Sequence, residues 1–251
     1  MSPTHTPEDH FQGKSVPEHL KEARRKGALA SSEIHGTEIA GHIGAFADSA
    51  KESAVYLLLL WVVLHQMQMP FSQMVAILSL FSCGLLIWKA GRSALLGWAR
   101  LERLHRVIEE ERWEIEHHRA QEREELYELY RAKGFSGKLL DEVIEVLMAD
   151  DNRLLNIMLE EELGLTLEVY EHPLKQGAFA ALGVLGAAGS LLLLLLAIPS
   201  FGLPLGSLIW ISLAVILATR QEKNQASPAL VWNLATVAMV AAFAFFLVKI
   251  L

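Results

Sequence analysis

The organisation of this chain is decided by residues 97–134, GWARLERLHRVIEEERWEIEHHRAQEREELYELYRAKG. Strong helix formers fill this stretch, and no proline or glycine interrupts it from Trp98 to Lys133. We therefore expect one uninterrupted helix that stops at Gly134, with basic residues in its last turn. Five side chains would then fall within roughly 60° of one another on this helix. They are Glu111, Glu114, His118, Glu122 and Glu125.

Four carboxylates on one stripe repel each other unless cations or partner residues compensate for their charge. A second acidic cluster follows in NIMLEEELGL, residues 156–165, which contains Met158 and Glu162. Hard oxygen ligands with a histidine and a nearby thioether suit a first-row divalent metal. The alternative is that these charges form a solvated helix face, and periodicity alone leaves both interpretations open.

The composition indicates membrane segments joined to a charged soluble part, because 52% of the 251 residues are hydrophobic and 20% are charged. The net charge of −7 is concentrated between Glu102 and Glu171, so nucleic acid is not an expected partner. Cys83 is the single cysteine of the sequence, which excludes an intrachain disulfide and a CxxC metal site.

Five segments are candidate transmembrane helices. Three are long enough to cross about 30 Å of hydrocarbon, a fourth is shorter but uncharged, and a fifth carries Asp48, Lys51 and Glu52 in its first half. In that order they are Phe71–Trp88, Gly177–Ile198, Ala229–Val248, Leu203–Thr219 and Gly44–Leu64. Five spans place the basic segments 21–26 and 220–225 on one side with the acidic block, and the positive-inside rule makes that side cytoplasmic.

The predicted fold is therefore an all-α membrane protein with five transmembrane helices and a three-helix cytoplasmic bundle inserted between helices 2 and 3. The second bundle helix is expected from Gly137 to Ala149, and the third from a cap at Asp150 or Asp151 to Gly164. The expected division is a cytosolic N-terminal tail (1–37), helices 1 and 2 (38–95), the cytoplasmic domain (96–172) and helices 3 to 5 (173–251).

Several stretches resemble the vacuolar iron transporter family. They are EERWEIE, QEREELYELYRAKGFSG, VIEVLMADDNRLLNIMLEEELGL and HPLKQGAFAALGVLGAAGSLLLLLLAI, and the resemblance is good from about Arg106 to Leu251. It implies a dimer with five transmembrane helices and a cytoplasmic metal-binding domain. It also implies movement of Fe²⁺ or Mn²⁺ out of the cytosol by proton exchange.

By position, the resemblance assigns metal binding to Glu111, Glu114, Glu122, Glu125, Met158 and Glu162. Leu159 stands where the family often has a second methionine. Residues 117–120, HHRA, stand where it tends to have a proline between the two glutamate pairs.

The resemblance is poor over the first two spans. Asp48 matches a transmembrane aspartate of the family, and Glu52 lies on the same face of the first span. In the second span WKAGRSALLG replaces an acidic segment, so that Lys89 and Arg92 stand where an acidic ligand is expected. Lys89 either neutralises Asp48 or Glu52 at membrane depth, or marks the cytosolic edge of the span. We therefore assign the candidate transport pathway to Asp48, Glu52 and Lys89.

The leading interpretation is a homodimeric transporter of Fe²⁺ or Mn²⁺, with Zn²⁺ as a further candidate. The small residues Gly41, Gly44, Ala45 and Ala47 would let helices of two subunits approach closely. The alternative is a non-transporting membrane protein that keeps the metal-binding domain as a sensor or buffer. A di-iron enzyme is disfavoured because Glu114-x-x-His117 has no second such motif, and no P-loop or nucleophile motif is present. We expect no enzymatic activity.

Overall fold

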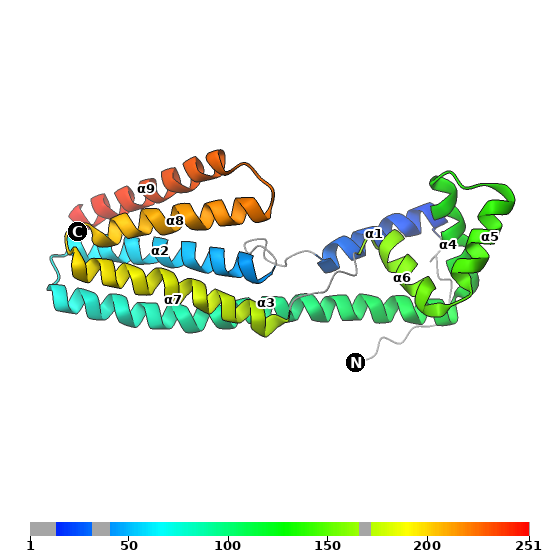
Figure 1. The fold of residues 1–251 in the computed structure, drawn as a ribbon, viewed down its shortest axis with the longest axis horizontal. Helices are drawn as coiled ribbons and strands as arrows, with labels where there is room; N and C mark the ends of the chain where they lie inside the picture. The colour runs from blue at the N-terminus through cyan, green and yellow to red at the C-terminus, as the bar shows by residue number, and fades with distance from the viewer. Residues whose placement is uncertain (1–13, 32–40, 166–171, 251) are drawn as a thin grey trace. The chain divides into compact units, whose positions relative to one another are not determined.

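The computed structural model describes residues 14–31, 41–165 and 172–250. Every regular element within these ranges is an α-helix, labelled α1 to α9 in Figure 1. The chain divides into two compact units: Met1–Ile34 with Ala99–Tyr170, here the acidic unit, and His35–Trp98 with Glu171–Leu251, here the membrane unit. Helix α3, Phe71–His117, is 47 residues long and contributes to both units.

Four helices are long and apolar enough to cross a membrane: α3, α7 (Pro173–Ala197), α8 (Gly202–Gln221) and α9 (Ala226–Ile250). They contain the four apolar runs expected from the sequence. Helix α2, His42–Gln66, contains the fifth run but is not among them, since Asp48, Lys51 and Glu52 lower the hydropathy of its first half. The five-span count therefore depends on how α2 compensates those charges.

Helix α2 packs along α7 and α8 through an apolar core that includes Leu57, Leu191 and Ile211. Its backbone approaches α7 so closely that a Cβ added at Gly183 would lie 2.4 Å from the carbonyl oxygen of Phe46. The small residues Gly44, Ala45 and Ala47 are buried within this one chain. The small-residue face expected to join two subunits is thus already used between helices of a single chain.

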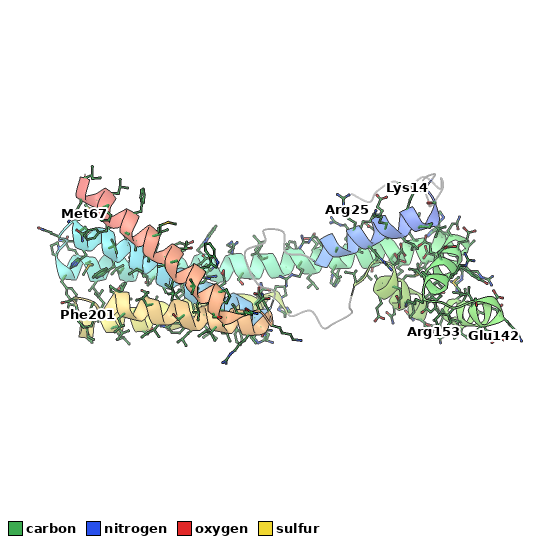
Figure 2. All side chains as sticks on the ribbon, turned by 90° about the horizontal axis from the view of Figure 1, so that it is seen from above. Lys14, Arg25, Met67, Glu142, Arg153 and Phe201 are labelled. Atoms are coloured by element: carbon green, nitrogen blue, oxygen red, sulfur yellow. The ribbon has the colours of Figure 1, made fainter. Side chains whose placement is uncertain are left out.

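The outward faces of the membrane unit are apolar. Large exposed side chains include Leu80, Ile87 and Trp88 on α3, and Trp232 and Phe243 on α9. Contiguous apolar surface of this kind suits hydrocarbon or another protein rather than water. The turns that contain Met67 and Phe201 lie at the same end of the helices (Figure 2), as alternating up-and-down spans require.

The acidic unit contains α1 (Val16–Ser31), the end of α3, α4 (Arg119–Ala132), α5 (Gly137–Met148) and α6 (Asp151–Glu161). Its apolar core includes Leu126, Ile144 and Leu154, all fully buried. The local predictions for the second and third bundle helices are confirmed. Gly134 and Gly164 both have positive φ at helix ends, and the Asp150 carboxylate caps α6 by accepting a hydrogen bond from the Arg153 amide at 2.8 Å.

The uninterrupted helix predicted from Trp98 to Lys133 is wrong. Helix α3 ends at His117, and α4 begins at Arg119 after His118, which leaves the helical conformation with φ −124° and ψ 32°. Two ring contacts accompany the break: His117 stacks on Trp113 with centroids 4.4 Å apart, and His118 meets the same ring edge-on at 5.4 Å. The His117 ring nitrogen also lies 2.8 Å from the Trp113 carbonyl oxygen, where it competes for a helical acceptor.

The expectation of an N-terminal tail also needs correction, because residues 16–31 form α1. Leu20 and Ala23 of this helix are buried, and Ala23 belongs to the apolar core of the acidic unit. The predicted three-helix bundle is therefore larger than expected. It contains a break between α3 and α4, and it includes a helix from the start of the chain.

Candidate metal centre

Four glutamates that lie far apart in the sequence converge inside the acidic unit. Glu111 comes from α3, Glu122 and Glu125 from α4, and Glu162 from the residue that caps the end of α6. All four are buried, with exposed fractions of 3% or less. Glu111 can face Glu122 and Glu125 because the chain breaks at His118, whereas the predicted uninterrupted helix would have left these three side by side along its length.

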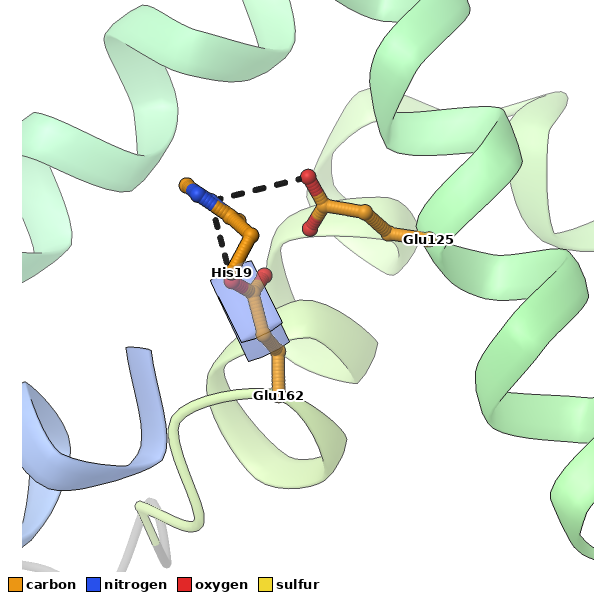
Figure 3. A group of neighbouring side chains, drawn as sticks. All are labelled: His19, Glu125 and Glu162. Atoms are coloured by element: carbon orange, nitrogen blue, oxygen red, sulfur yellow. Dashed lines mark ion pairs between the residues drawn. The ribbon is translucent and has the colours of Figure 1, made fainter. Parts of the chain in front are cut away.

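The carboxylate oxygens form two sets of ligand atoms that share Glu162. Glu111, Glu122 and Glu162 each place one oxygen within 4.8 Å of the others, and His19, Glu125 and Glu162 do the same with a ring nitrogen. In the second set, shown in Figure 3, the His19 Nε2 lies 3.6 Å from Glu125 Oε1 and 3.8 Å from Glu162 Oε1. Three or more groups at such spacing can converge on one small cation or on two.

A small cavity of about 20 Å³ lies beside this cluster. Glu111, Glu114 and Glu162 line it, together with His19 and Lys26 of α1. Glu114 is only partly buried, so it lies at the edge of the cavity and not in the closed centre. The volume is enough for one water molecule or one ion.

Burial and mutual repulsion make these carboxylates poor acids. Burial, followed by repulsion from Glu111 and Glu125, raises the pKa of Glu122 to about 11. Burial raises the pKa of Glu125 to about 8, although a hydrogen bond with Glu162 acts in the opposite direction. The pKa values of Glu111 and Glu162 are also raised well above normal, first by burial and then by neighbouring carboxylates, while Lys26 lowers both. Protons or cations must therefore neutralise the cluster at neutral pH.

One carboxylate oxygen of Glu111, Oε1, lacks a hydrogen-bond partner among the described residues. The Glu111 side chain is 3% exposed. A buried carboxylate oxygen without a partner is costly, and a metal ion directly supplies the missing interaction. The donor set of several carboxylates and one imidazole is chemically suited to Fe²⁺, Mn²⁺ or Zn²⁺.

The other predicted ligands take different places. Met158 is fully buried in the apolar core, one helical turn before Glu162, whose amide donates to the Met158 carbonyl oxygen at 2.9 Å. His118 lies at the helix break against Trp113. Among the three consecutive glutamates Glu160 is exposed, and Glu161 pairs with Lys133. Glu162 is thus the member of this run that enters the centre.

Sequence reasoning missed His19. Its signal was present in residues 16–27, where Val16, Leu20, Ala23 and Gly27 recur at helical spacing and predict one packed face. His19 lies beside that face, at the N-terminal end of the helix. The charged and polar residues around it hid the pattern.

The membrane unit holds a second ionisable cluster. The Lys89 Nζ lies 3.1 Å from Asp48 Oδ2 and 3.3 Å from Glu52 Oε2, and Lys89 and Asp48 are both buried. Lys51 adds a second ion pair to Asp48 at 3.4 Å. Lys89 is therefore paired with both carboxylates, while its depth in the membrane stays a prediction. Arg92 lies one turn further along α3 and is partly exposed.

The sequence model of the VIT family, the vacuolar iron transporters, matches residues 98–249, more than half of the chain. The chain belongs to the VIT family. The resemblance stated from the sequence is thereby confirmed. The matched range contains Glu111, Glu114, Glu122, Glu125 and Glu162. His19, Asp48 and Lys89 lie outside it, and no curated protein matches the chain as a relative.

Members of the VIT family are membrane transporters of iron or manganese, and the family is not one of enzymes. Together with four helices suited to a bilayer, family membership makes this chain an integral membrane protein. The family transports divalent metal ions, and the two sets of ligand atoms in the acidic unit are chemically suited to such ions.

Proposed function

We propose that this chain moves Fe²⁺ or Mn²⁺ out of the cytosol, and that the buried glutamates of the acidic unit capture the ion first. The observation that carries the proposal is the convergence of Glu111, Glu122, Glu125 and Glu162 in a closed interior. Four buried carboxylates in a stable domain need positive charge, and a divalent ion supplies it with direct oxygen ligation. Glu114 at the cavity edge completes the proposed capture site, whereas Met158 lies in the apolar core one helical turn before Glu162.

We propose that α2 is the fifth transmembrane helix. Its charges are compensated inside the helix bundle, because Lys89 pairs with both Asp48 and Glu52. Ionisable residues at membrane depth tend to pair in this way and to mark ion pathways. In this arrangement the N-terminus and the acidic unit are cytoplasmic, which agrees with the absence of lysine and arginine from loops 65–70 and 197–204.

Proton coupling follows naturally from the chemistry of the ligands. Carboxylates bind H⁺ and divalent metal at the same oxygen atoms, so the two compete for one site. In the acidic unit the raised pKa values of Glu122 and Glu125 mean that metal capture releases protons near neutral pH. In the membrane, Asp48 and Glu52 would exchange the same two cations during each cycle.

We further propose that the protein is a homodimer. The small residues of α2 pack within the chain, so the subunit contact would use exposed apolar surface instead. The outer face of α3, with Leu80, Ile87 and Trp88, belongs to the second span and offers such a surface. This face of α3 is equally suited to contact lipid. A mass measurement in detergent distinguishes a dimer from a monomer whose α3 face is covered by lipid or detergent.

A second candidate function is a membrane-anchored metal sensor or buffer that does not transport. It is favoured by one observation: the Lys89 ammonium already occupies the carboxylates of the candidate pathway, which lies outside the range matched by the family. A fixed cation there repels an entering divalent ion.

Flux into proteoliposomes distinguishes these two functions. The purified chain would be reconstituted, and uptake of Fe²⁺ and Mn²⁺ measured with and without a pH gradient. The transporter function requires saturable flux that Asp48→Asn abolishes and that an opposing proton gradient accelerates. Tight metal binding without any flux would establish the sensor instead. Lys14→Ala, at an exposed position two residues before α1, serves as the control for reconstitution.

A further inference from the structure

Helix α1 presents a nitrogen ligand to the glutamate cluster. The His19 side chain is 15% exposed, and its Nε2 lies 3.6 Å from a Glu125 oxygen and 3.8 Å from a Glu162 oxygen. Figure 3 shows the imidazole directed toward both carboxylates, which come from α4 and from the end of α6. Ligands bound to one metal at about 2.1 Å lie roughly 3 to 3.5 Å apart, so these three atoms are a few tenths of an ångström from a coordinating arrangement.

Close packing and a hydrogen bond hold α1 against the residues around Glu162. Leu20 and Ala23 of this helix are buried, and Ala23 belongs to the apolar core of the acidic unit. Gly27 lies so close to the residue after Glu162 that an added Cβ would be 1.9 Å from the Leu163 carbonyl oxygen. Arg24 donates a hydrogen bond to the carbonyl oxygen of Glu161 at 3.3 Å. The helix is therefore held on both sides of Glu162, and a glycine is required for it to lie there.

The centre itself has room for such a ligand. Glu111 is buried with an Oε1 that has no hydrogen-bond partner among the described residues, and this side chain belongs to the other ligand set that shares Glu162. A small cavity between α1 and the glutamates is lined by His19 and Glu162. These observations point to a bound ion and not to a simple ion pair between an imidazolium and two carboxylates.

We propose that α1 is a cover of the metal centre, and that His19 supplies a nitrogen ligand to an ion held by Glu125 and Glu162. The inference rests on the proposed metal capture by the glutamates and adds its selectivity. Imidazole suits Fe²⁺, Co²⁺ and Zn²⁺, whereas Mn²⁺ favours an all-oxygen environment. A centre with His19 in place therefore prefers the first group, and the same centre with α1 displaced prefers it less.

The test is metal binding to the full-length protein in detergent, with Co²⁺ as a coloured probe and Mn²⁺ as its oxygen-preferring counterpart. His19→Ala should lower Co²⁺ affinity at least about tenfold, change the visible spectrum of the bound Co²⁺, and lower Mn²⁺ affinity much less. Gly27→Ala should reproduce both changes, because it displaces α1 while every ligand side chain remains. Lys21→Ala, at an exposed position of the same helix, should leave affinities and spectrum unchanged.

The outcomes separate this inference from the function on which it rests. Co²⁺ binding that Glu122→Gln weakens but His19→Ala leaves intact, with an unaltered spectrum, would overturn the role of His19 alone. Absence of Co²⁺ and Mn²⁺ binding in the wild-type protein would overturn the proposed capture site and this inference together. Equal losses of Co²⁺ and Mn²⁺ affinity in His19→Ala would show an electrostatic or structural role and would also overturn the ligand assignment.

Discussion

The ammonium nitrogen of Lys89 lies 3.1 Å from an oxygen of Asp48, and both side chains are buried among the helices of the membrane unit. Lys89 also pairs with Glu52 at 3.3 Å. Two carboxylates and one ammonium leave a net charge of −1. The partly exposed Lys51 compensates this charge through a second ion pair with Asp48. A divalent ion that enters this cluster must displace Lys89 or share its carboxylates.

Replacement of Lys89 by methionine is therefore expected to increase metal flux severalfold. The change removes a cation that competes with the metal, and it adds a thioether, a soft ligand. Uptake of Mn²⁺ and Fe²⁺ into proteoliposomes measures the effect. Lys51→Met is the matched control, because that ammonium is a third exposed and, among the described residues, forms its ion pair with Asp48. Equal or lower flux in Lys89→Met would show that Lys89 does not obstruct the pathway.

The same substitution should destabilise the metal-free protein. Removal of one partner from a buried ion pair costs about 3–5 kcal/mol when the remaining charge has no compensation, and the cost is smaller here because Lys51 still pairs with Asp48. Lys89→Met should therefore unfold at a lower temperature in detergent, and saturating Mn²⁺ should restore part of the loss. Lys89→Met with Asp48→Asn should be more stable than Lys89→Met alone, since a neutral amide needs no counter-ion. A double variant no more stable than the single one would contradict the pairing.

The acidic unit should lose stability as pH rises when metal is absent. The pKa of Glu125 is about 8 and that of Glu122 about 11 in the folded protein, against an ordinary value of 4.5. Above pH 4.5 the unfolded chain releases protons that the folded chain retains, so each such carboxyl lowers stability by about 1.4 kcal/mol per pH unit until its folded pKa is reached. A buried carboxylate in an ion pair has the opposite effect, because its lowered pKa makes the folded protein more stable as pH rises.

Hydrogen exchange of residues 119–132 between pH 5 and pH 8 measures this effect within the full chain. Exchange should accelerate with pH beyond the intrinsic chemical rate in EDTA, and Mn²⁺ should suppress that acceleration. Glu122→Gln should flatten the dependence, because glutamine needs no proton and keeps helix propensity. Protection that is independent of pH in EDTA would contradict the raised pKa values.

Metal stoichiometry should depend most strongly on Glu162, because it belongs to both ligand sets. We expect more than one divalent ion per chain by calorimetry. Glu162→Gln should weaken all of the binding, whereas Glu111→Gln should weaken only part of it. Replacement of Glu111, Glu114, Glu122 and Glu125 together by glutamine should remove most binding and keep the helices. Glu160→Gln, two residues from Glu162 but exposed, is the control and should leave binding unchanged.

Local signals in the sequence predicted much of this molecule. The cap at Asp150 and the stops at Gly134 and Gly164 depend on a few neighbouring residues, so the second and third bundle helices follow from them. The four apolar helices follow from length and hydropathy. The buried glutamates were singled out by charge repulsion and by resemblance, although their geometry was wrong.

What the sequence concealed depends on contacts between distant residues. The break at His118 occurs between strong helix formers and is accompanied by ring contacts with Trp113, which propensity does not reveal. The place of α1 depends on Gly27 against Leu163, a contact across 136 positions of the chain. The Lys89 pairing likewise joins α2 and α3, and positional charge rules left two interpretations of Lys89 open.

The contribution of α1 makes a final prediction about a fragment that spans Arg100 to Tyr170. This fragment keeps Glu111, Glu122 and Glu162 but lacks His19, Lys26 and the buried side chains of α1. It should bind Mn²⁺ through its carboxylates, yet bind Co²⁺ more weakly than the full chain, because the nitrogen ligand and part of the apolar core are missing.

A synthetic peptide of residues 14–31 added in excess should restore Co²⁺ affinity and helicity. The same peptide with His19→Ala should restore helicity without affinity, and with Gly27→Ala it should restore neither. Calorimetry and circular dichroism measure the two responses separately, and full Co²⁺ affinity in the fragment alone would show that α1 is dispensable.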